Sequence, residues 1–327
     1  MLPELLEGRL GLPVIAAPMF LASGPRLVIE CCKAGVIAGF PALNQRTSEG
    51  LEQWLGEITS ALAAEEQETG QAPAPFGVNL VVHPSNPRLQ ADLALCIKYK
   101  APIVMTILGA DARLVDAVHA YGGIVIHDVV NPKHARKAAS AGVDVLIAVA
   151  AGAGGHGGSL SPFALVNEIR QFFDKTIILS GSISKGGDVA AAQMMGADLA
   201  YMGTRFLATR ECQVTDAYKQ MLIDATAMDI IYTPVVSGVP ANFLARSLHL
   251  AGINPETDQK PAFDLGLELA GAEDDEEKKP WRDIWSAGQG VGSIRDLPTA
   301  SELITRLKKE YLEAGQAQKI HLEALAV

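Results

Sequence analysis

Short apolar runs alternate with longer amphipathic stretches over the first two thirds of the chain. Most of the short runs are apolar at nearly every position, which is typical of strands buried on both faces of a parallel sheet. The stretches between them repeat their apolar residues at helical spacing. The pattern predicts strands at 14–19, 36–42, 76–82, 103–108, 123–129, 143–150, 176–183 and 199–206, with helices near 25–34, 51–66, 86–99, 111–121, 132–141, 162–173 and 186–195.

Prolines and glycines mark the expected ends of these helices. Pro132 and Pro162 stand where two helices begin, and proline suits the first helical turn. Several helices are followed by a glycine before the next strand, as is common at a helix C-terminus. These glycines are Gly35, Gly122, Gly142 and Gly196.

Eight strands that alternate with helices predict an α/β fold, a (β/α)₈ TIM barrel, with a doubly wound open sheet as the alternative. The open sheet is disfavoured because the chain reads Phe20-Leu21-Ala22-Ser23-Gly24-Pro25 after the first strand, without the G-x-G-x-x-G of dinucleotide-binding folds. In a barrel the functional site lies at the C-terminal ends of the strands. The loops that follow the strands are therefore the places to look for chemistry.

The pattern changes after Glu211. Residues 216–230 read as helical, 232–255 mix turns with a helix, and 256–280 lose periodicity around the acidic run Glu273-Asp274-Asp275-Glu276-Glu277, which we interpret as a solvated loop. A last amphipathic helix is predicted at about 300–315. We therefore expect a barrel at 1–215, a small, mainly helical lid or substrate subdomain at 216–283, and a C-terminal segment at 284–327 that returns to the barrel.

Composition narrows the class of protein. Apolar residues make up 49% of the 327 residues and charged residues 20%, which is enough for a large core. A net charge of −10 without a basic stripe argues against nucleic-acid binding. No 18-residue uncharged apolar run and no basic, signal-like N-terminus occur, so we expect a cytoplasmic protein without a membrane span. No metal site or disulfide is expected, because the cysteines lack the spacing of either; they are Cys31, Cys32, Cys96 and Cys212.

A glycine-rich loop surrounds one histidine after the sixth predicted strand: Gly152-Ala153-Gly154-Gly155-His156-Gly157-Gly158. Glycine lets a backbone adopt positive φ and approach a ligand closely. The imidazole of His156 would then stand in a concave setting, within reach of whatever binds. The alternative is a flexible surface loop with an incidental histidine.

Two further glycine turns close the seventh and eighth strands. They are Ser180-Gly181-Ser182-Ile183 and Met202-Gly203-Thr204-Arg205-Phe206, and their glycines are 22 residues apart. That spacing fits one strand–helix–strand unit, so both turns should lie at the same end of neighbouring parallel strands. Backbone N–H groups at two adjacent strand ends form a phosphate cradle.

Six short motifs follow one another along nearly the whole chain. They are Ala16-Ala17-Pro18-Met19, Pro75-Phe76-Gly77-Val78-Asn79, Ala153-Gly154-Gly155-His156-Gly157-Gly158, Ser180-Gly181-Ser182-Ile183, Met202-Gly203-Thr204-Arg205-Phe206 and Trp285-Ser286-Ala287-Gly288-Gln289-Gly290. In this order they resemble the nitronate monooxygenase (2-nitropropane dioxygenase) family of FMN enzymes, which also takes in FMN-dependent enoyl-ACP reductases and NADH:quinone reductases. The set is specific for the superfamily and much less so for the reaction.

The resemblance implies that FMN lies across the barrel mouth. Its phosphate is expected on the backbone of Gly181-Ser182 and Gly203-Thr204, and its isoalloxazine on the Ala17-Pro18-Met19 turn. Asn79 would hydrogen-bond a ring edge, since an amide offers both a donor and an acceptor. As alternatives, Asn79 caps a turn and Met19 fills the core. The remaining expected cofactor contacts are Gly154, Gly155, Ser180, Met202 and Gln289.

The chain also departs from the family pattern. The fourth strand reads Val104-Met105-Thr106-Ile107-Leu108-Gly109, without the histidine that one class of nitronate monooxygenases uses as a base. The fifth strand has His127-Asp128 where the reductases often have a lysine after the histidine, and the seventh-strand turn is Gly-Ser rather than Gly-Gly. These departures leave His156 as the expected catalytic acid or base.

The resemblance favours FMN-dependent oxidation of an alkyl nitronate by O₂ to a carbonyl compound and nitrite. The small-molecule substrate would be a nitronate or nitroalkane, and a homodimer is left open. His156 would donate a hydrogen bond or proton to the nitro oxygens, or act as base on a neutral nitroalkane. His83 and His127, at or near strand ends, are weaker candidates. The alternatives are NAD(P)H-dependent reduction of a quinone or an enoyl thioester, and FMN binding without turnover.

Overall fold

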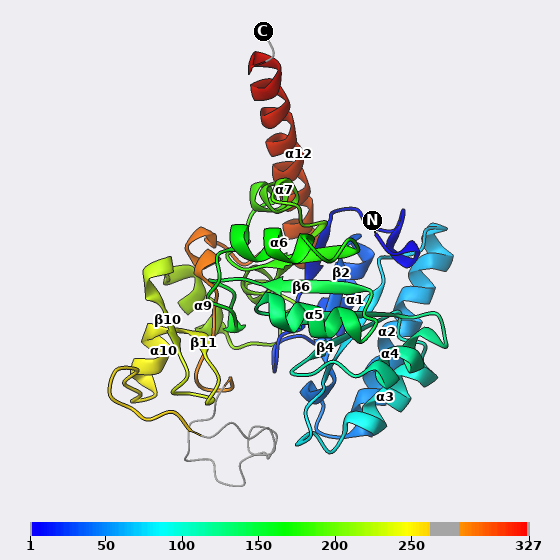
Figure 1. Ribbon diagram of the computed structural model, residues 1–327, viewed down its shortest axis with the longest axis horizontal. Coiled ribbons are helices and arrows are strands. Elements are labelled where there is room, and N and C mark those ends of the chain that lie inside the picture. The colour runs from blue at the N-terminus through cyan, green and yellow to red at the C-terminus, as the bar shows by residue number, and fades with distance from the viewer. Residues whose placement is uncertain (1, 262–280, 326–327) are drawn as a thin grey trace.

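The computed structural model describes residues 2–261 and 281–325, and its centre is a closed barrel of eight parallel strands (Figure 1). The first strand pairs with the last, Val14 opposite Ala200, so the sheet has no edge and the open-sheet alternative is wrong. In order around the barrel the strands are β1 (Val14–Ala16), β2 (Ile37–Pro41), β3 (Phe76–Val81), β4 (Ile103–Ile107), β5 (Ile124–Val129), β6 (Val145–Val149), β8 (Thr176–Ser180) and β9 (Leu199–Met202).

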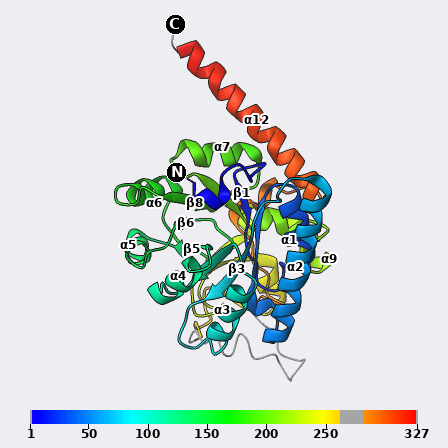
Figure 2. The same cartoon turned by 90° about the vertical axis from the view of Figure 1, so that its right-hand side faces the viewer.

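Helices surround the barrel, as Figure 2 shows in a view roughly along the barrel axis. α5 and α6 begin at Pro132 and Pro162, as predicted, and the four glycines expected at helix ends all have positive φ, between 82° and 98°. The helices that connect the strands are α1 (Pro25–Lys33), α2 (Ser48–Thr69), α3 (Leu89–Lys98), α4 (Ala112–His119), α5 (Pro132–Ser140), α6 (Pro162–Arg170) and α7 (Gly186–Met194).

The core has two layers, because each strand is buried on both faces. In β1, Ile15 faces the barrel interior, whereas Val14 and Ala16 pack in the outer layer beneath the helices. This explains the continuous apolar runs. Leu6, in the 3₁₀ turn η1 (Glu4–Leu6), joins the inner layer and closes the N-terminal end of the barrel. The four cysteines are buried in the outer layer and none is in a disulfide.

The strands end earlier than predicted on the side of the mouth. β1 stops at Ala16 instead of residue 19, because Ala17 donates the last ladder hydrogen bond to the carbonyl of Met202 (3.0 Å) and Pro18 has no N–H to continue it. β9 stops at Met202, and Thr204 already begins the short helix α8 (Thr204–Leu207). The residues predicted to end these strands therefore form loops at the mouth.

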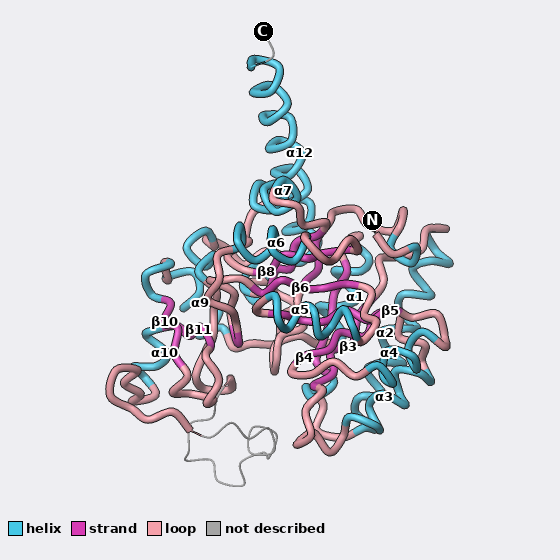
Figure 3. Tube along the Cα trace, in the orientation of Figure 1, coloured by secondary structure: helices cyan, strands magenta, loops and turns pink. Residues whose placement is uncertain are grey.

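A second, small sheet covers one side of the mouth. It is antiparallel, in the order β10 (Ile230–Thr233), β11 (Ala241–Leu244), β7 (Gly155–His156), and it brings the histidine loop beside a hairpin from the C-terminal third (Figure 3). This hairpin lies between α9 (Asp216–Asp224) and α10 (Ala245–Leu250), inside the segment predicted as the lid, and the sequence pattern did not show it. The acidic run Glu273–Glu277 lies outside the described residues. The division at 215 and 283 remains a proposal.

The last helix, α12 (Ala300–Leu325), is longer than the predicted 300–315. Its first turns bury Ala300, Leu303, Ile304 and Leu307, and it packs on α7. Its C-terminal half extends away from the barrel (Figures 1 and 2). Among the described helices, none is long and apolar enough to cross a membrane.

Candidate active site at the barrel mouth

A pocket opens at the C-terminal ends of the barrel strands, where the sequence placed the site. Met202 and Gln289 do not line it: Met202 packs in the outer core, and Gln289 is exposed. The other predicted residues all line the pocket. They are Ala17, Pro18, Met19, Asn79, Gly154, Gly155, His156, Ser180, Gly181, Ser182, Gly203 and Thr204.

The turn after β1 forms an apolar part of the floor. Ser23 Oγ accepts a hydrogen bond from the N–H of Met19 (3.0 Å). Asn44 Nδ2 donates to the carbonyls of Met19 (3.1 Å) and Ser23 (2.8 Å), while its Oδ1 accepts from the N–H of Leu21 (2.8 Å), which adopts a left-handed φ of 58°. The turn is thus held by polar side chains behind it, and Pro18 and Met19 present an apolar surface to the pocket. Sequence reasoning missed Asn44.

Asn79 lies within β3 and is buried at the edge of the pocket. Its Nδ2 donates a long hydrogen bond, 3.4 Å, to the carbonyl of Met105 on the neighbouring strand. The amide of Asn79 therefore connects two neighbouring strands and does not cap a turn. Its Oδ1 and second N–H remain suited to a polar ring edge.

The two glycine turns differ in why they need glycine. Gly181 has φ +129°, and a Cβ there would lie 2.9 Å from the carbonyl oxygen of Ala151, so the backbone itself requires glycine. Gly203 has an ordinary φ of −99°, and a Cβ would meet nothing nearer than Ala17 and Met19 at 3.8 Å. The N–H groups of Ser182 and Gly203 donate to no other described residue. The open space beside Gly203 and the N–H donors of Ser182 and Gly203 therefore lie together between the two turns.

The glycine-rich loop is glycine-rich partly because another backbone lies against it. A Cβ on Gly154 would lie 2.9 Å from the N of Gly288, and a Cβ on Gly288 would lie 2.6 Å from the carbonyl of Gly152. The N–H of Gln289 donates to that same carbonyl (2.9 Å). These glycines are therefore needed for the close packing of two chain segments, and not only for the approach of a ligand.

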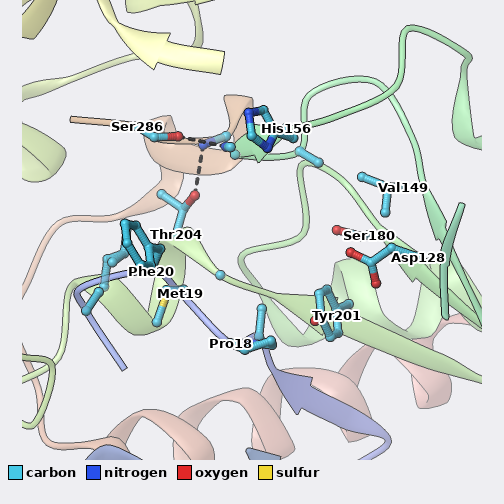
Figure 4. Close-up of a pocket in the computed structure, with 18 of the residues that line it drawn as sticks. Pro18, Met19, Phe20, Asp128, Val149, His156, Ser180, Tyr201, Thr204 and Ser286 are labelled. Carbon is cyan, nitrogen blue, oxygen red and sulfur yellow. Dashed lines mark hydrogen bonds between the residues drawn. The ribbon is translucent and has the colours of Figure 1, made fainter. Parts of the chain in front are cut away.

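Hydroxyl groups join these segments across the roof of the pocket (Figure 4). Ser286 Oγ accepts from the N–H of Gly155 (2.7 Å) and donates to the carbonyl of Asn242 (2.6 Å). Thr204 Oγ1 accepts from the N–H of Gly288 (2.8 Å). The loop is therefore part of the pocket wall, held by hydrogen bonds to two other segments.

His156 is held in the roof by β-sheet pairing and by two side chains. It lies opposite Ala241 of β11, and its ring packs edge-to-face on Trp281, with centroids 5.1 Å apart. Its Nε2 is 3.0 Å from Ser237 Oγ, which donates in turn to the carbonyl of Val239 (3.2 Å). These contacts fix the position and the plane of the imidazole ring. Burial lowers the pKa of His156 to about 4, so the imidazole is neutral at neutral pH.

A carboxyl group that sequence reasoning did not select faces the pocket from the barrel. Asp128, at the end of β5, lines the pocket near Tyr201 and Ser180 (Figure 4). Its Oδ1 is buried and has no hydrogen-bond partner among the described residues. Burial raises the pKa of Asp128 to about 7. Two polar residues, His127 and Asp128, near the end of an otherwise apolar strand were the signal that could have found it.

The two weaker histidine candidates lie outside the pocket lining. His127 points from β5 to the outer layer, where its Nδ1 is 2.7 Å from Thr106 Oγ1. Burial first, and then the charges of His134 and Lys137, lower its pKa to about 4. His83 lies in the loop after β3, with Nδ1 2.7 Å from Ser85 Oγ. Neither therefore reaches the pocket.

The model of the nitronate monooxygenase family matches residues 8–310 of this chain. The chain belongs to the nitronate monooxygenase family. Nitronate monooxygenase of Paraburkholderia phytofirmans is 28% identical over 91% of this chain and 92% of that protein. A second relative, from Rhodococcus jostii, is named (3aS,4S,5R,7aS)-5-hydroxy-7a-methyl-1-oxo-octahydro-1H-indene-4-carboxyl-CoA dehydrogenase; it is 30% identical over 72% of this chain and 63% of that protein.

Solved structures give the same result. Nitroalkane oxidase from Streptomyces ansochromogenes superposes with a TM-score of 0.79 at 26% identity, over 96% of this chain and 100% of that one. FabK from Thermotoga maritima superposes with a TM-score of 0.78 at 27% identity, over 97% of both chains. The family and these neighbours consist of flavin-dependent enzymes, and this member of the nitronate monooxygenase family is an oxidoreductase.

Proposed function

We propose that this member of the nitronate monooxygenase family binds FMN and oxidises alkyl nitronates with O₂ to a carbonyl compound and nitrite. The observation that carries the proposal is the meeting, in one pocket, of a two-turn phosphate cradle and a neutral histidine fixed above it. FMN, when bound, supplies the electron transfer from substrate to O₂.

The residues of the pocket fit FMN. The open space beside Gly203 and the donors of Ser182 and Gly203 suit a single phosphate. The apolar Pro18–Met19 surface suits one face of a flat ring, and Asn79 offers an amide to its edge. The described part of the pocket lining offers one such cradle, which suits a mononucleotide better than a dinucleotide.

His156 is the residue best placed to act on the substrate. A neutral imidazole can donate a hydrogen bond to nitro oxygens or take a proton from the carbon of a neutral nitroalkane. A preformed nitronate has no such proton to lose. None of the described residues lining the pocket is a lysine or arginine, so an anionic substrate would be held by hydrogen-bond donors.

A second candidate is redox chemistry on an acyl thioester, with NAD(P)H as the reductant when an enoyl thioester is reduced. The name of one relative favours it: the Rhodococcus protein is named as a carboxyl-CoA dehydrogenase.

Anaerobic stopped-flow mixing separates the two candidates. The purified protein, with its flavin identified after heat release, is mixed with propyl-2-nitronate and, separately, with NADH and NADPH. We expect flavin bleaching by the nitronate and, in air, O₂ consumption matched by nitrite. Rapid bleaching by a pyridine nucleotide, with no reaction with the nitronate, would select the reductase.

A further inference from the structure

Asp128 combines three features that the proposed reaction does not use. Its carboxyl group lines the pocket from the barrel side, its Oδ1 is buried, and that atom has no partner among the described residues. A buried carboxyl oxygen without a donor is costly as an anion, so the group favours its protonated form. A protonated carboxyl is a hydrogen-bond donor that needs an acceptor.

The groups around Asp128 do not offer it a counter-charge. The other titratable side chains lining the described pocket are His156, Tyr201 and Tyr218. Burial lowers the pKa of His156 to about 4, and it raises the pKa values of Tyr201 and Tyr218 above the usual range for tyrosine. Asp128 is therefore the group of this set whose charge changes near neutral pH.

We propose that Asp128 is a positioning residue that donates a hydrogen bond, as a neutral carboxylic acid, to the flavin bound in the pocket. The inference rests on the proposed binding of FMN. A ligand that fills the pocket removes the remaining water from this carboxyl and so favours the protonated form still further. Binding is then linked to the uptake of a proton wherever the free protein has already lost it.

The linkage predicts a pH dependence with a definite sign. In the free protein the carboxyl ionises above about pH 7. Above that pH, FMN must bind together with a proton, so its Kd rises by up to about tenfold per pH unit. Below it the carboxyl is already protonated, and the Kd loses this dependence.

The experiment titrates apoprotein with FMN by fluorescence quenching from pH 6 to about 9.5, with wild type and Asp128→Asn in parallel. Asparagine keeps a donor of similar size but does not ionise, so its Kd should stay flat where that of wild type rises. The phosphate of FMN titrates alike in both and cancels in their ratio. Parallel Kd profiles in the two proteins would overturn the proposal.

A control variant separates position from burial. Asp92, on α3, is another buried carboxyl whose pKa burial raises, but it lies away from the pocket lining. Asp92→Asn should therefore keep the wild-type slope. Loss of the slope in this variant would contradict the assignment to Asp128.

A measurement without flavin distinguishes failure of this proposal from failure of the proposed cofactor. In apoprotein the folded carboxyl keeps its proton up to about pH 7, whereas an unfolded aspartate loses it at about pH 3.9. The urea midpoint of wild type, relative to Asp128→Asn, should therefore fall as the pH rises from about 4 to 7 and level off above 7. If FMN does not bind at any pH, the proposed cofactor is wrong, and so is the donor role of Asp128, even if the urea midpoint shifts as described. FMN binding without either pH effect would sink the role of Asp128 alone.

Discussion

The floor and the roof of the pocket are built from different kinds of structure. The floor comes from the ends of barrel strands, whose ladder hydrogen bonds fix Asn79, Asp128 and Tyr201. The roof joins segments far apart in the chain: Ser237 lies 81 residues from His156, and Ser286 lies 131 residues from Gly155. The floor is thus fixed by backbone register, and the roof by a few side-chain bridges.

Burial shifts the pKa values of the floor carboxyl and the roof histidine in opposite directions. Burial disfavours the charged form of any group, so it raises the pKa of Asp128 in the floor to about 7 and lowers that of His156 in the roof to about 4. At neutral pH the pocket therefore holds a neutral imidazole above and, below it, a carboxyl near the midpoint of its titration. Under the two proposals above, proton transfer with substrate accordingly belongs to the roof and ligand positioning to the floor.

Replacing the roof histidine should give the largest effect. We expect His156→Asn to keep FMN bound but to lower turnover of a neutral nitroalkane by about 10²–10⁴-fold, because asparagine cannot exchange a proton. The deficit should shrink with a preformed nitronate. Steady-state nitrite formation from both substrates measures the difference.

Ser237→Ala is the matched control for this prediction. It keeps the imidazole but removes the hydroxyl that lies 3.0 Å from Nε2, so its loss of activity should be smaller than that of His156→Asn. If His156→Asn matched wild type on both substrates, the histidine would be structural. Asp128 would then be the remaining acid, since His83 and His127 lie outside the pocket lining.

The two cradle glycines should fail in different ways. Gly203→Val should keep the fold, because its φ is ordinary and its space is open, but it should weaken FMN binding by about 100-fold, or roughly 3 kcal/mol. Gly181→Ala should instead destabilise the fold by about 1–3 kcal/mol, because of its φ of +129° and the carbonyl of Ala151 at 2.9 Å. FMN titration and urea unfolding of each variant test the pair. Unchanged FMN affinity in Gly203→Val would place the phosphate elsewhere.

The neutral histidines should make the protein sensitive to acid. His127 and His156 have folded pKa values of about 4, below the ~6.5 of an unfolded histidine. The unfolded chain therefore binds more protons between these values, and stability is lost as the pH falls from 6.5 towards 4, by up to roughly 3 kcal/mol for each histidine. Urea midpoints of wild type and His127→Asn across this range should diverge at pH 7 and converge towards pH 4. A constant difference would show that His127 is not the cause.

Removing one bridge of the roof should have the smallest effect. Ser286→Ala loses the hydrogen bonds from the N–H of Gly155 and to the carbonyl of Asn242, which should cost about 1–2 kcal/mol of stability. FMN should still bind, because the floor is intact. Ser140→Ala, on the exposed face of α5, is the control and should change the thermal midpoint little. Equal midpoints for both variants would mean that the bridge is not needed.

The sequence by itself determined the barrel, the helix ends and the mouth. Fully apolar strands can only be buried on both faces, and a glycine after each of several helices reports the turn into the next strand. Parallel strands put all their following loops at one end, so Pro18, Asn79, His156, Gly181 and Gly203 were expected together and line one pocket.

Only the tertiary structure decided which of two adjacent residues in a strand faces the pocket. Val125 and Ile126 are both buried, so the pattern of β5 contains no information about which face is inward, and His127 and Asp128 could not be told apart. The roof was hidden for a related reason: the pairing of His156 with Ala241 and the contact of Gly154 with Gly288 depend on non-local backbone approach. Such close contacts require glycine, which the sequence shows, but a glycine does not indicate which other segment packs against it.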